Sequence, residues 1–357
     1  MSLVVAIAAL ALVEGLCRLA LGPDPMTSQS AIFAIDDEVG FRIAPNLNFD
    51  GFTTTSLGTR GAEPDFSKKE RILVLGDSIT IGADVRDEET FCHLLEKRLG
   101  AGAQVINAGC AGYCCIEEFS ALRRLVPQVR PTRVLIIYYT GNDVGDAGRI
   151  ERPYLVLAGR LVARTKYEET PPSMRMLNNL AAAFWSFGIP RAARRLKGAE
   201  PALVVNEKQG NFGMDNLEVK QLIELDNYEL ATAEGRNKVA IGWRRTSEVF
   251  KEIRDYCNEQ KLPLTVAIMP LATVFDPGLR SRLSLLWKVP GRSIDAERPS
   301  RKVDELLRRL GIDTLDLTPA FRESPHQSKL HLPLDLHLSP LGHALVADVL
   351  ARRVEVK

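Results

Sequence analysis

The strongest constraint on the fold is an alternation of apolar strand-like runs with helix-like segments, which begins at Arg71. Two runs, Ile72–Leu75 and Val134–Tyr139, contain no charged residue and are typical of strands buried on both faces. The other predicted elements are helices over 89–99, 116–125, 228–260, 301–310 and 340–353, with strands over 105–106, 264–269 and 314–317. Strands that alternate with helices through short connections predict an α/β fold, a three-layer sandwich with a central parallel sheet flanked by helices.

The pattern divides the chain of 357 residues into three parts. Residues 1–22 are predicted as an N-terminal membrane anchor, and residues 23–60 as a linker followed by short strands. Residues 61–357 form the α/β domain, which is interrupted at about 145–235. The interruption contains a predicted hairpin over 154–163 and a helical stretch over 174–196, so we interpret it as a cap inserted into the domain.

The N-terminus is unusually apolar. Leu3–Val13 is an unbroken apolar run, and apolar residues continue to Leu21 across two charges, which gives about the 20 residues that a bilayer-spanning helix needs. A cleaved signal peptide would require a basic start and a small-x-small exit, and neither is present. Leu16 is too large for the lipobox that lipidation of Cys17 would need. We therefore predict an uncleaved signal anchor, rather than a buried or amphipathic helix, with the globular domain outside the cytoplasm (periplasmic or outer surface).

Composition excludes several functional classes. Lys and Arg number 46 against 45 Asp and Glu, so no global positive field would attract nucleic acid. The six cysteines form no CxxC pair and no zinc-site spacing. We expect neither a metal nor an organic cofactor.

Polar or turn-forming residues follow three of the predicted strands. Ser78 comes directly after the first buried run, in the sequence Gly-Asp-Ser-Ile-Thr, while Gly112 and Asn142 follow the next two strands. Carboxyl ends of parallel strands are where open α/β sheets bind ligands. Each residue alone also fits a simpler role, Ser78 as a helix cap and the other two as turn residues. The G-x-S-x-G elbow is absent, which disfavours an α/β-hydrolase.

A second polar group lies near the C-terminus, before the last predicted helix. Ser339 and Pro340 are a good N-cap and first helical residue, so the residues before them are predicted to be extended. Because residues two apart in an extended segment point to the same side, Asp335 and His337 would face one site. A carboxylate beside an imidazole can fix its tautomer and stabilise the imidazolium. His343, inside the helix, is predicted to be structural.

These four blocks, in this order, resemble those of the SGNH or GDSL-type hydrolase superfamily. Gly76–Thr80 matches its first block, Gly112 its glycine, Gly141–Asp143 its asparagine block and His337 its histidine block. The resemblance implies a flavodoxin-like three-layer fold and an enzyme that acts on ester bonds.

The sequence around the blocks resembles that of membrane-anchored bacterial members of the superfamily. The matching stretches are Ser56–Gly61, before the first strand, and Leu315–Pro319, before the histidine block. This similarity agrees with the predicted signal anchor.

The resemblance also assigns roles to the residues. Ser78 would be the nucleophile, His337 the general base and Asp335 the residue that orients the imidazole. The backbone N–H groups of Ser78 and Gly112 and the side-chain amide of Asn142 would form the oxyanion hole.

One departure from the pattern bears on the reaction. The common block has Asp three residues before the histidine, whereas this chain has Leu334 there and Asp335 two residues before. That Asp-x-His spacing is similar to the spacing in alginate O-acetyltransferase-type relatives, so both hydrolysis and acyl transfer stay open.

Three functions follow from the sequence. The first is a serine esterase that removes O-acyl groups, acetyl above all, from a carbohydrate or lipid. The second is an O-acyltransferase on an exported polysaccharide, and the third is a non-catalytic subunit of a membrane complex that retains the fold. The expected partners are the acylated substrate and the membrane.

Overall fold

The computed structural model describes residues 13, 32–49, 51–148, 154–157, 160–163, 239–275, 295–332 and 337–355. Most of the predicted anchor and cap, the helical stretch predicted over 174–196, and Asp335 lie outside the described residues. Within the described ranges, no helix is both long enough and apolar enough to cross a membrane.

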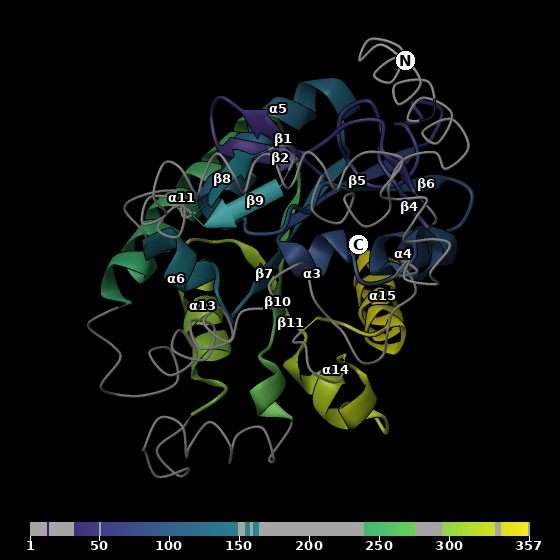
Figure 1. The fold of residues 1–357 in the computed structure, drawn as a ribbon. Helices are drawn as coiled ribbons and strands as arrows, with labels where there is room; N and C mark the ends of the chain where they lie inside the picture. Colours follow the sequence, from purple (N-terminus) through teal and green to yellow (C-terminus); the bar gives the residue numbers. More distant parts are fainter. Residues whose placement is uncertain are drawn as a thin grey trace, which may run out of the picture.

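A parallel sheet forms the centre of the domain (Figure 1). Its order is β11-β10-β7-β5-β6, and each neighbouring pair is parallel. The strands are β5 (Glu70–Gly76), β6 (Ala103–Asn107), β7 (Arg133–Tyr139), β10 (Leu264–Met269) and β11 (Asp313–Asp316). From β5 the chain goes first to β6 on one side and then to β7 on the other. This reversal is a topological switch point, where open α/β sheets have a crevice outside the strand ends.

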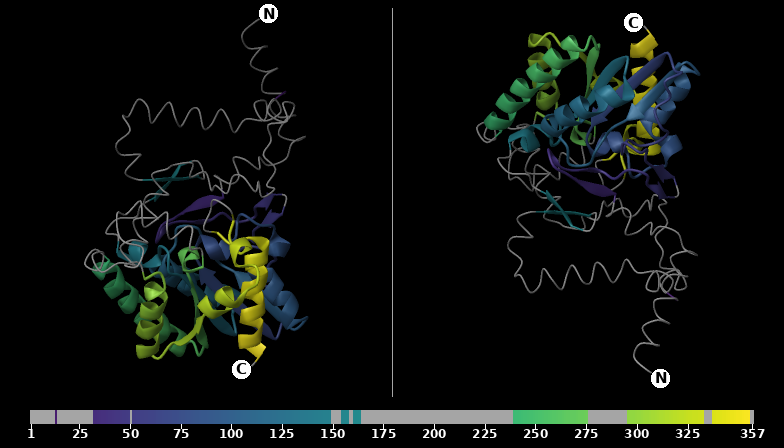
Figure 2. Two further views of the ribbon diagram at one scale, coloured as in Figure 1. Left: turned by 90° about the horizontal axis from the view of Figure 1, so that it is seen from below. Right: turned by 90° about the horizontal axis from the view of Figure 1, so that it is seen from above.

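Helices cover both faces of the sheet, as Figure 1 shows. In both views of Figure 2, α11 (green) and α15 (yellow) lie apart on the two sides of the domain. One face packs against α5 (Cys115–Val129), α11 (Ala240–Glu259) and α13 (Arg298–Arg309). The opposite face packs against α4 (Phe91–Leu99), α14 (Thr318–Glu323) and α15 (Pro340–Glu355). The predicted three-layer sandwich is therefore confirmed.

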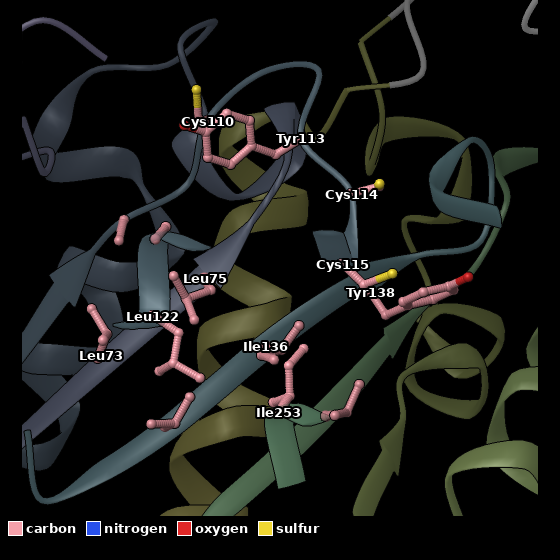
Figure 3. Close-up of a cluster of buried hydrophobic side chains, with 14 of the residues drawn as sticks. Leu73, Leu75, Cys110, Tyr113, Cys114, Cys115, Leu122, Ile136, Tyr138 and Ile253 are labelled. Carbon is pink, nitrogen blue, oxygen red and sulfur yellow. The ribbon is translucent and has the colours of Figure 1, made fainter. Parts of the chain in front are cut away.

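The apolar runs of the sequence fill both cores because successive strand residues point to opposite faces. Leu73 and Leu75 of β5 and Ile136 of β7 pack with Leu122 of α5 and Ile253 of α11 on one face (Figure 3). The intervening residues of the same strands pack on the other face, against α4 and α15. A strand buried on both faces has no polar alternation, which explains why the sequence reads as continuous apolar runs.

Short strands and helices lie outside the sheet. The antiparallel pairs are β1 (Phe33–Asp36) with β2 (Gly40–Ile43), β3 (Asn48–Phe49) with β4 (Phe52–Thr53), and β8 (Tyr154–Leu157) with β9 (Arg160–Ala163). The short helices are α3 (Ser78–Ile81), α6 (Asp143–Gly148), and the 3-10 turns η1 (Asp87–Glu89), η3 (Ala272–Val274) and η5 (Gln327–Lys329). The hairpin predicted over 154–163 and the short strands before residue 60 are thus confirmed.

Candidate active site

Ser78 stands at the first position of α3, directly after the central strand β5. The Asp77 carboxylate caps this helix by accepting a hydrogen bond of 2.9 Å from the N–H of Ile79. The first N–H groups of a helix have no partner within it, so the N–H of Ser78 is not used by the helix itself. Ser78 is partly exposed, while both its neighbours are buried. The serine is therefore presented at the carboxyl edge of the sheet by a capped turn.

Gly112 lies in the loop that follows β6, the neighbour of β5. Its φ of 81° is left-handed, a conformation that favours glycine, and the N–H of Tyr113 closes the turn on the carbonyl of Cys110 at 3.1 Å. The same loop approaches α3 very closely, because a Cβ on Gly109 would lie 2.4 Å from the nitrogen of Ile81. The glycines thus bring the loop against the helix that begins at Ser78.

Asn142 follows β7, the strand on the other side of β5. Its Nδ2 donates a hydrogen bond of 3.1 Å to Oδ2 of Asp146. A side-chain amide has two N–H donors, and this bond uses one of them. Asn142 is also partly exposed. Ser78, Gly112 and Asn142 therefore follow three adjacent strands at the switch point of the sheet.

His337 is held by the backbone around it. Its carbonyl accepts a hydrogen bond of 2.9 Å from the N–H of Leu332, and the Ser339 N–H donates to the carbonyl of Leu330 at 2.9 Å. The Ser339 hydroxyl accepts a hydrogen bond from the N–H of Gly342, as the predicted N-cap of α15 should. The loop is therefore tied on both sides of the histidine.

The side chain of His337 lies near the residue that precedes Ser78. Burial raises the pKa of Asp77 to about 6, while the hydrogen bond from Ile79 and the charge of His337 act in the opposite direction. The charge of His337 thus acts on the acid that caps the helix beginning at Ser78. Sequence blocks from opposite ends of the domain are thus brought together.

The carboxylate next to His337 is Asp84, which the sequence analysis did not single out. Oδ2 of Asp84 lies 3.0 Å from Nδ1 of His337, and the two side chains are 15% and 19% exposed. Asp84 belongs to the loop after α3, six residues beyond Ser78. No spacing rule pairs it with a histidine at the far end of the domain, so only the three-dimensional structure could find it.

Arg60 fixes the loop that carries Asp84. Its guanidinium is almost fully buried and lies over the ring of Phe52. All five of its N–H donors are used, and the acceptors are the Asp87 carboxylate and the carbonyls of Gly51, Ile81, Gly82 and Val85. Arg60 therefore connects two parts of the chain. One is the segment from the end of α3 to Asp87, and the other is the β3–β4 strand pair, which precedes the domain.

Three buried acids lie beneath the site. Asp77, Glu118 and Asp143 are completely buried. Burial, followed by the charges of neighbouring acids and Cys115, raises the pKa values of Glu118 and Asp143 well above the usual range. Burial therefore reduces the negative charge at this end of the sheet. Within the described part of the chain, no group of three or more His, Cys, Asp or Glu side chains is placed to hold a metal ion.

His343 has a structural position, as the sequence predicts. It is buried, its ring stacks on Phe91, and its Nδ1 accepts a hydrogen bond of 3.2 Å from the N–H of Phe91. Burial, with smaller effects from the charges of Arg60 and His337, lowers its pKa to about 3. The ring is therefore neutral at physiological pH and links α15 to α4.

Comparison with known proteins gives a match over the first part of this domain. Residues 74–213 match the GDSL-like Lipase/Acylhydrolase family, and this segment includes Ser78, Gly112 and Asn142. None of the curated proteins matches the chain.

The solved structures that are similar to the chain have low sequence identity to it. A lipase/acylhydrolase from Enterococcus faecalis is 14% identical with a TM-score of 0.36, and the match covers 80% of this chain and 95% of that one. The acetyl xylan esterase AlAXEase is 13% identical with a TM-score of 0.41, covering 80% and 99%. TesA is 12% identical with a TM-score of 0.41, covering 80% and 98%.

The predicted superfamily is confirmed by the family match, which includes three of the four blocks on which the prediction rested. The histidine block lies beyond the matched residues, and the structure carries it to the same end of the sheet. Residues 74–213 are thus similar to the GDSL-like lipases and acylhydrolases, enzymes that act on ester bonds.

Proposed function

We propose that this protein is a serine esterase that removes O-acyl groups, acetyl above all, from a carbohydrate or lipid. The observation that carries the proposal is the contact of His337 with Asp84, on the loop that directly follows the short helix beginning at Ser78. A nucleophile, a base and hydrogen-bond donors in one crevice are the groups that acyl transfer requires.

The reaction would proceed in two steps. The Ser78 hydroxyl oxygen attacks the carbonyl carbon of the ester as His337 accepts the hydroxyl proton, and the alcohol leaves with that proton. Water then attacks the acyl-serine, again with His337 as the base, which releases the acid and restores the serine. The contact of Nδ1 with Asp84 supports Nε2 as the proton-accepting atom.

The oxyanion hole would combine three groups. The N–H groups of Ser78 and Gly112 and the second N–H of Asn142 would hold the negative oxygen that forms in each step. The hydrogen bond from Asn142 to Asp146 supports this role, because it fixes the amide without using both of its donors.

The predicted surroundings of the site complete the proposal. The segment 1–22 would anchor the chain in a membrane with the domain outside the cytoplasm, and the cap at about 145–235 would line the substrate pocket. Asp335 stays a predicted member of a Ser-His-Asp triad, because it lies outside the described residues.

The test is turnover of p-nitrophenyl acetate by the purified protein, with and without an acceptor oligosaccharide. We expect acetate release at a rate that the acceptor does not change. Transfer of acetyl to the oligosaccharide would instead identify the acyltransferase to which the Asp-x-His spacing points. The absence of both reactions across a panel of acetylated sugars and lipid esters would favour the non-catalytic subunit.

A further inference from the structure

A carboxylate on the loop after α3 contacts the histidine that we propose as the base. Asp84 and His337 are separated by most of the domain in sequence, yet Oδ2 and Nδ1 lie 3.0 Å apart. Both side chains are largely shielded from water, so their electrostatic interaction is screened less than at the surface. The contact therefore has the environment in which a carboxylate can control an imidazole.

The loop around Asp84 is held in place by backbone hydrogen bonds and by packing, which an ion pair on the surface does not need. The N–H of Val85 donates to the carbonyl of Gly82 at 3.1 Å, and the carbonyl of Val85 accepts from the buried Arg60 at 2.7 Å. A Cβ on Gly82 would lie 2.9 Å from the ring of His343, so the turn also packs against α15. Asp84 is thus held on a fixed loop that reaches the helix following His337.

Oδ2 of Asp84 and Nδ1 of His337 are at contact distance, but they are not aligned as a hydrogen bond. Catalytic hydrogen bonds are often long or poorly aligned before substrate binds and become shorter in the complex. A small rotation of either side chain would direct an Nδ1 proton at the carboxylate.

We propose that Asp84 is a positioning residue of the active site, whose carboxylate fixes the orientation and tautomer of His337. With the proton on Nδ1, Nε2 is left to accept the proton of Ser78, and the carboxylate stabilises the imidazolium that forms. This inference rests on the proposed esterase function. In this proposal the imidazole interacts with the carboxylate of Asp84, on the loop after α3, in addition to Asp335, which the sequence predicts.

The first test measures kinetics of the full-length protein with p-nitrophenyl acetate. Asp84→Ala should lower kcat by between about 10² and about 10⁴, the scale on which a triad carboxylate acts, while KM changes little. Asp84→Glu should recover part of the loss, because it restores a carboxylate. A kcat of Asp84→Ala within a factor of about three of wild type, or a loss confined to KM, would overturn the proposal.

Asp87→Asn is the matched control. Asp87 begins η1, directly after the loop that carries Asp84, and its carboxylate accepts hydrogen bonds from Arg60 and Thr53. We expect this variant to lose more thermal stability than Asp84→Ala and less kcat. Two results would mean that Asp84 has only a structural role. One is a larger kcat loss in Asp87→Asn than in Asp84→Ala, and the other is a kcat loss in Asp84→Ala that matches its loss of folded protein.

A second measurement does not depend on turnover. The NMR titration of His337, identified among the five histidines by its absence in His337→Gln, reports the charge near its ring. Asp77, His343 and Arg60 share this region and stay unchanged in the variant. Removing the carboxylate in Asp84→Asn should lower the titration midpoint by about one pH unit, because an opposite charge favours the imidazolium. An unchanged midpoint would overturn the proposal.

The two measurements separate this inference from the proposed function. A wild type that hydrolyses no ester, together with a lowered His337 midpoint in Asp84→Asn, would refute the esterase and retain the contact. Turnover that requires Ser78 but is indifferent to Asp84 would retain the esterase and refute the positioning role. Asp335→Asn, measured in parallel, shows whether the second carboxylate also acts on His337.

Discussion

At the residue scale, the site depends on polar groups with defined partners. Asp77 caps the turn that presents Ser78, and Asn142 is fixed by Asp146. Both arrangements place a side chain or a backbone N–H in a set direction. Single substitutions should therefore separate chemistry from binding.

Asn142→Ala should lower kcat by about 10² to 10³ and leave KM nearly unchanged, because an oxyanion-hole donor acts where charge develops in the transition state. Steady-state kinetics with p-nitrophenyl acetate checks this. Asp146→Asn is a useful comparison, since it weakens the orientation of the amide but keeps its donors, and it should lose less. A loss carried mainly by KM would make Asn142 a substrate-binding residue instead.

The buried His343 should make stability fall in acid. Its folded pKa of about 3 lies below the unfolded value of 6.5, so the unfolded chain binds more protons between these values and the free energy of unfolding falls as pH drops through this range. The loss is about 1.4 kcal/mol for each pH unit. Urea unfolding between about pH 4.5 and about pH 7.5 should show a smaller loss in His343→Gln.

Asp77 should act in the opposite direction. Its folded pKa of about 6 lies above the ordinary 3.8, so its contribution to stability is present at low pH and is lost as pH rises between these values. Asp77→Asn should therefore make the acid loss steeper than in wild type. Equal slopes in wild type and both variants would contradict the assigned protonation states.

At the element scale, the short segment between α3 and η1 connects the site to the rest of the fold. It carries Asp84, and Arg60 binds two of its carbonyls and that of Ile81, the last residue of α3. Arg60 itself lies after β4, so the segment that the sequence analysis predicted as a linker and short strands supports the site in the structure.

Arg60→Lys should destabilise the protein by at least about 3 kcal/mol, because an ammonium cannot satisfy the buried acceptors of a five-donor guanidinium. It should also lower kcat, since the loop with Asp84 loses its support. Urea unfolding and kinetics measure the two effects. Arg123→Lys is the control, because Arg123 pairs with Glu38 on the surface and its loss should stay within about 0.5 kcal/mol. Equal losses in both variants would contradict the role of Arg60.

Elements with a strong periodic pattern were predictable from the sequence. The buried strands β5, β7 and β10 stand out as apolar runs, and α15 begins where Ser339 and Pro340 predicted. Long-range partners left no such pattern. Asp84 and Arg60 act through contacts that form only when the sheet assembles. A carboxylate a few residues after a serine looks the same in sequence whether or not the fold brings a histidine from far along the chain into contact with it.

At the scale of the whole molecule, the fold places the candidate site at the carboxyl ends of the sheet strands. The candidate residues follow β5, β6 and β7, next to the switch point between β5 and β7, where open α/β sheets bind their ligands. The proposed anchor and cap would then determine which acylated surface reaches that site.

The proposed anchor predicts how the chain partitions. Full-length protein should remain in the membrane pellet after a carbonate wash, because a segment of about 20 apolar residues spans the bilayer. A chain that begins at Thr27 should be released and should retain ester turnover. Release of the full-length chain by carbonate would indicate a peripheral or packed helix instead.

The most direct test of the account is labelling with a fluorophosphonate probe, followed by peptide mapping of the adduct. The probe reacts with an activated serine, so the account predicts one adduct, on Ser78, in parallel with turnover of p-nitrophenyl acetate. Ser78→Ala should fold with unchanged thermal stability and should neither react with the probe nor hydrolyse the ester. Labelling or turnover that persists in folded Ser78→Ala would contradict the assignment of the nucleophile, and with it the proposed function.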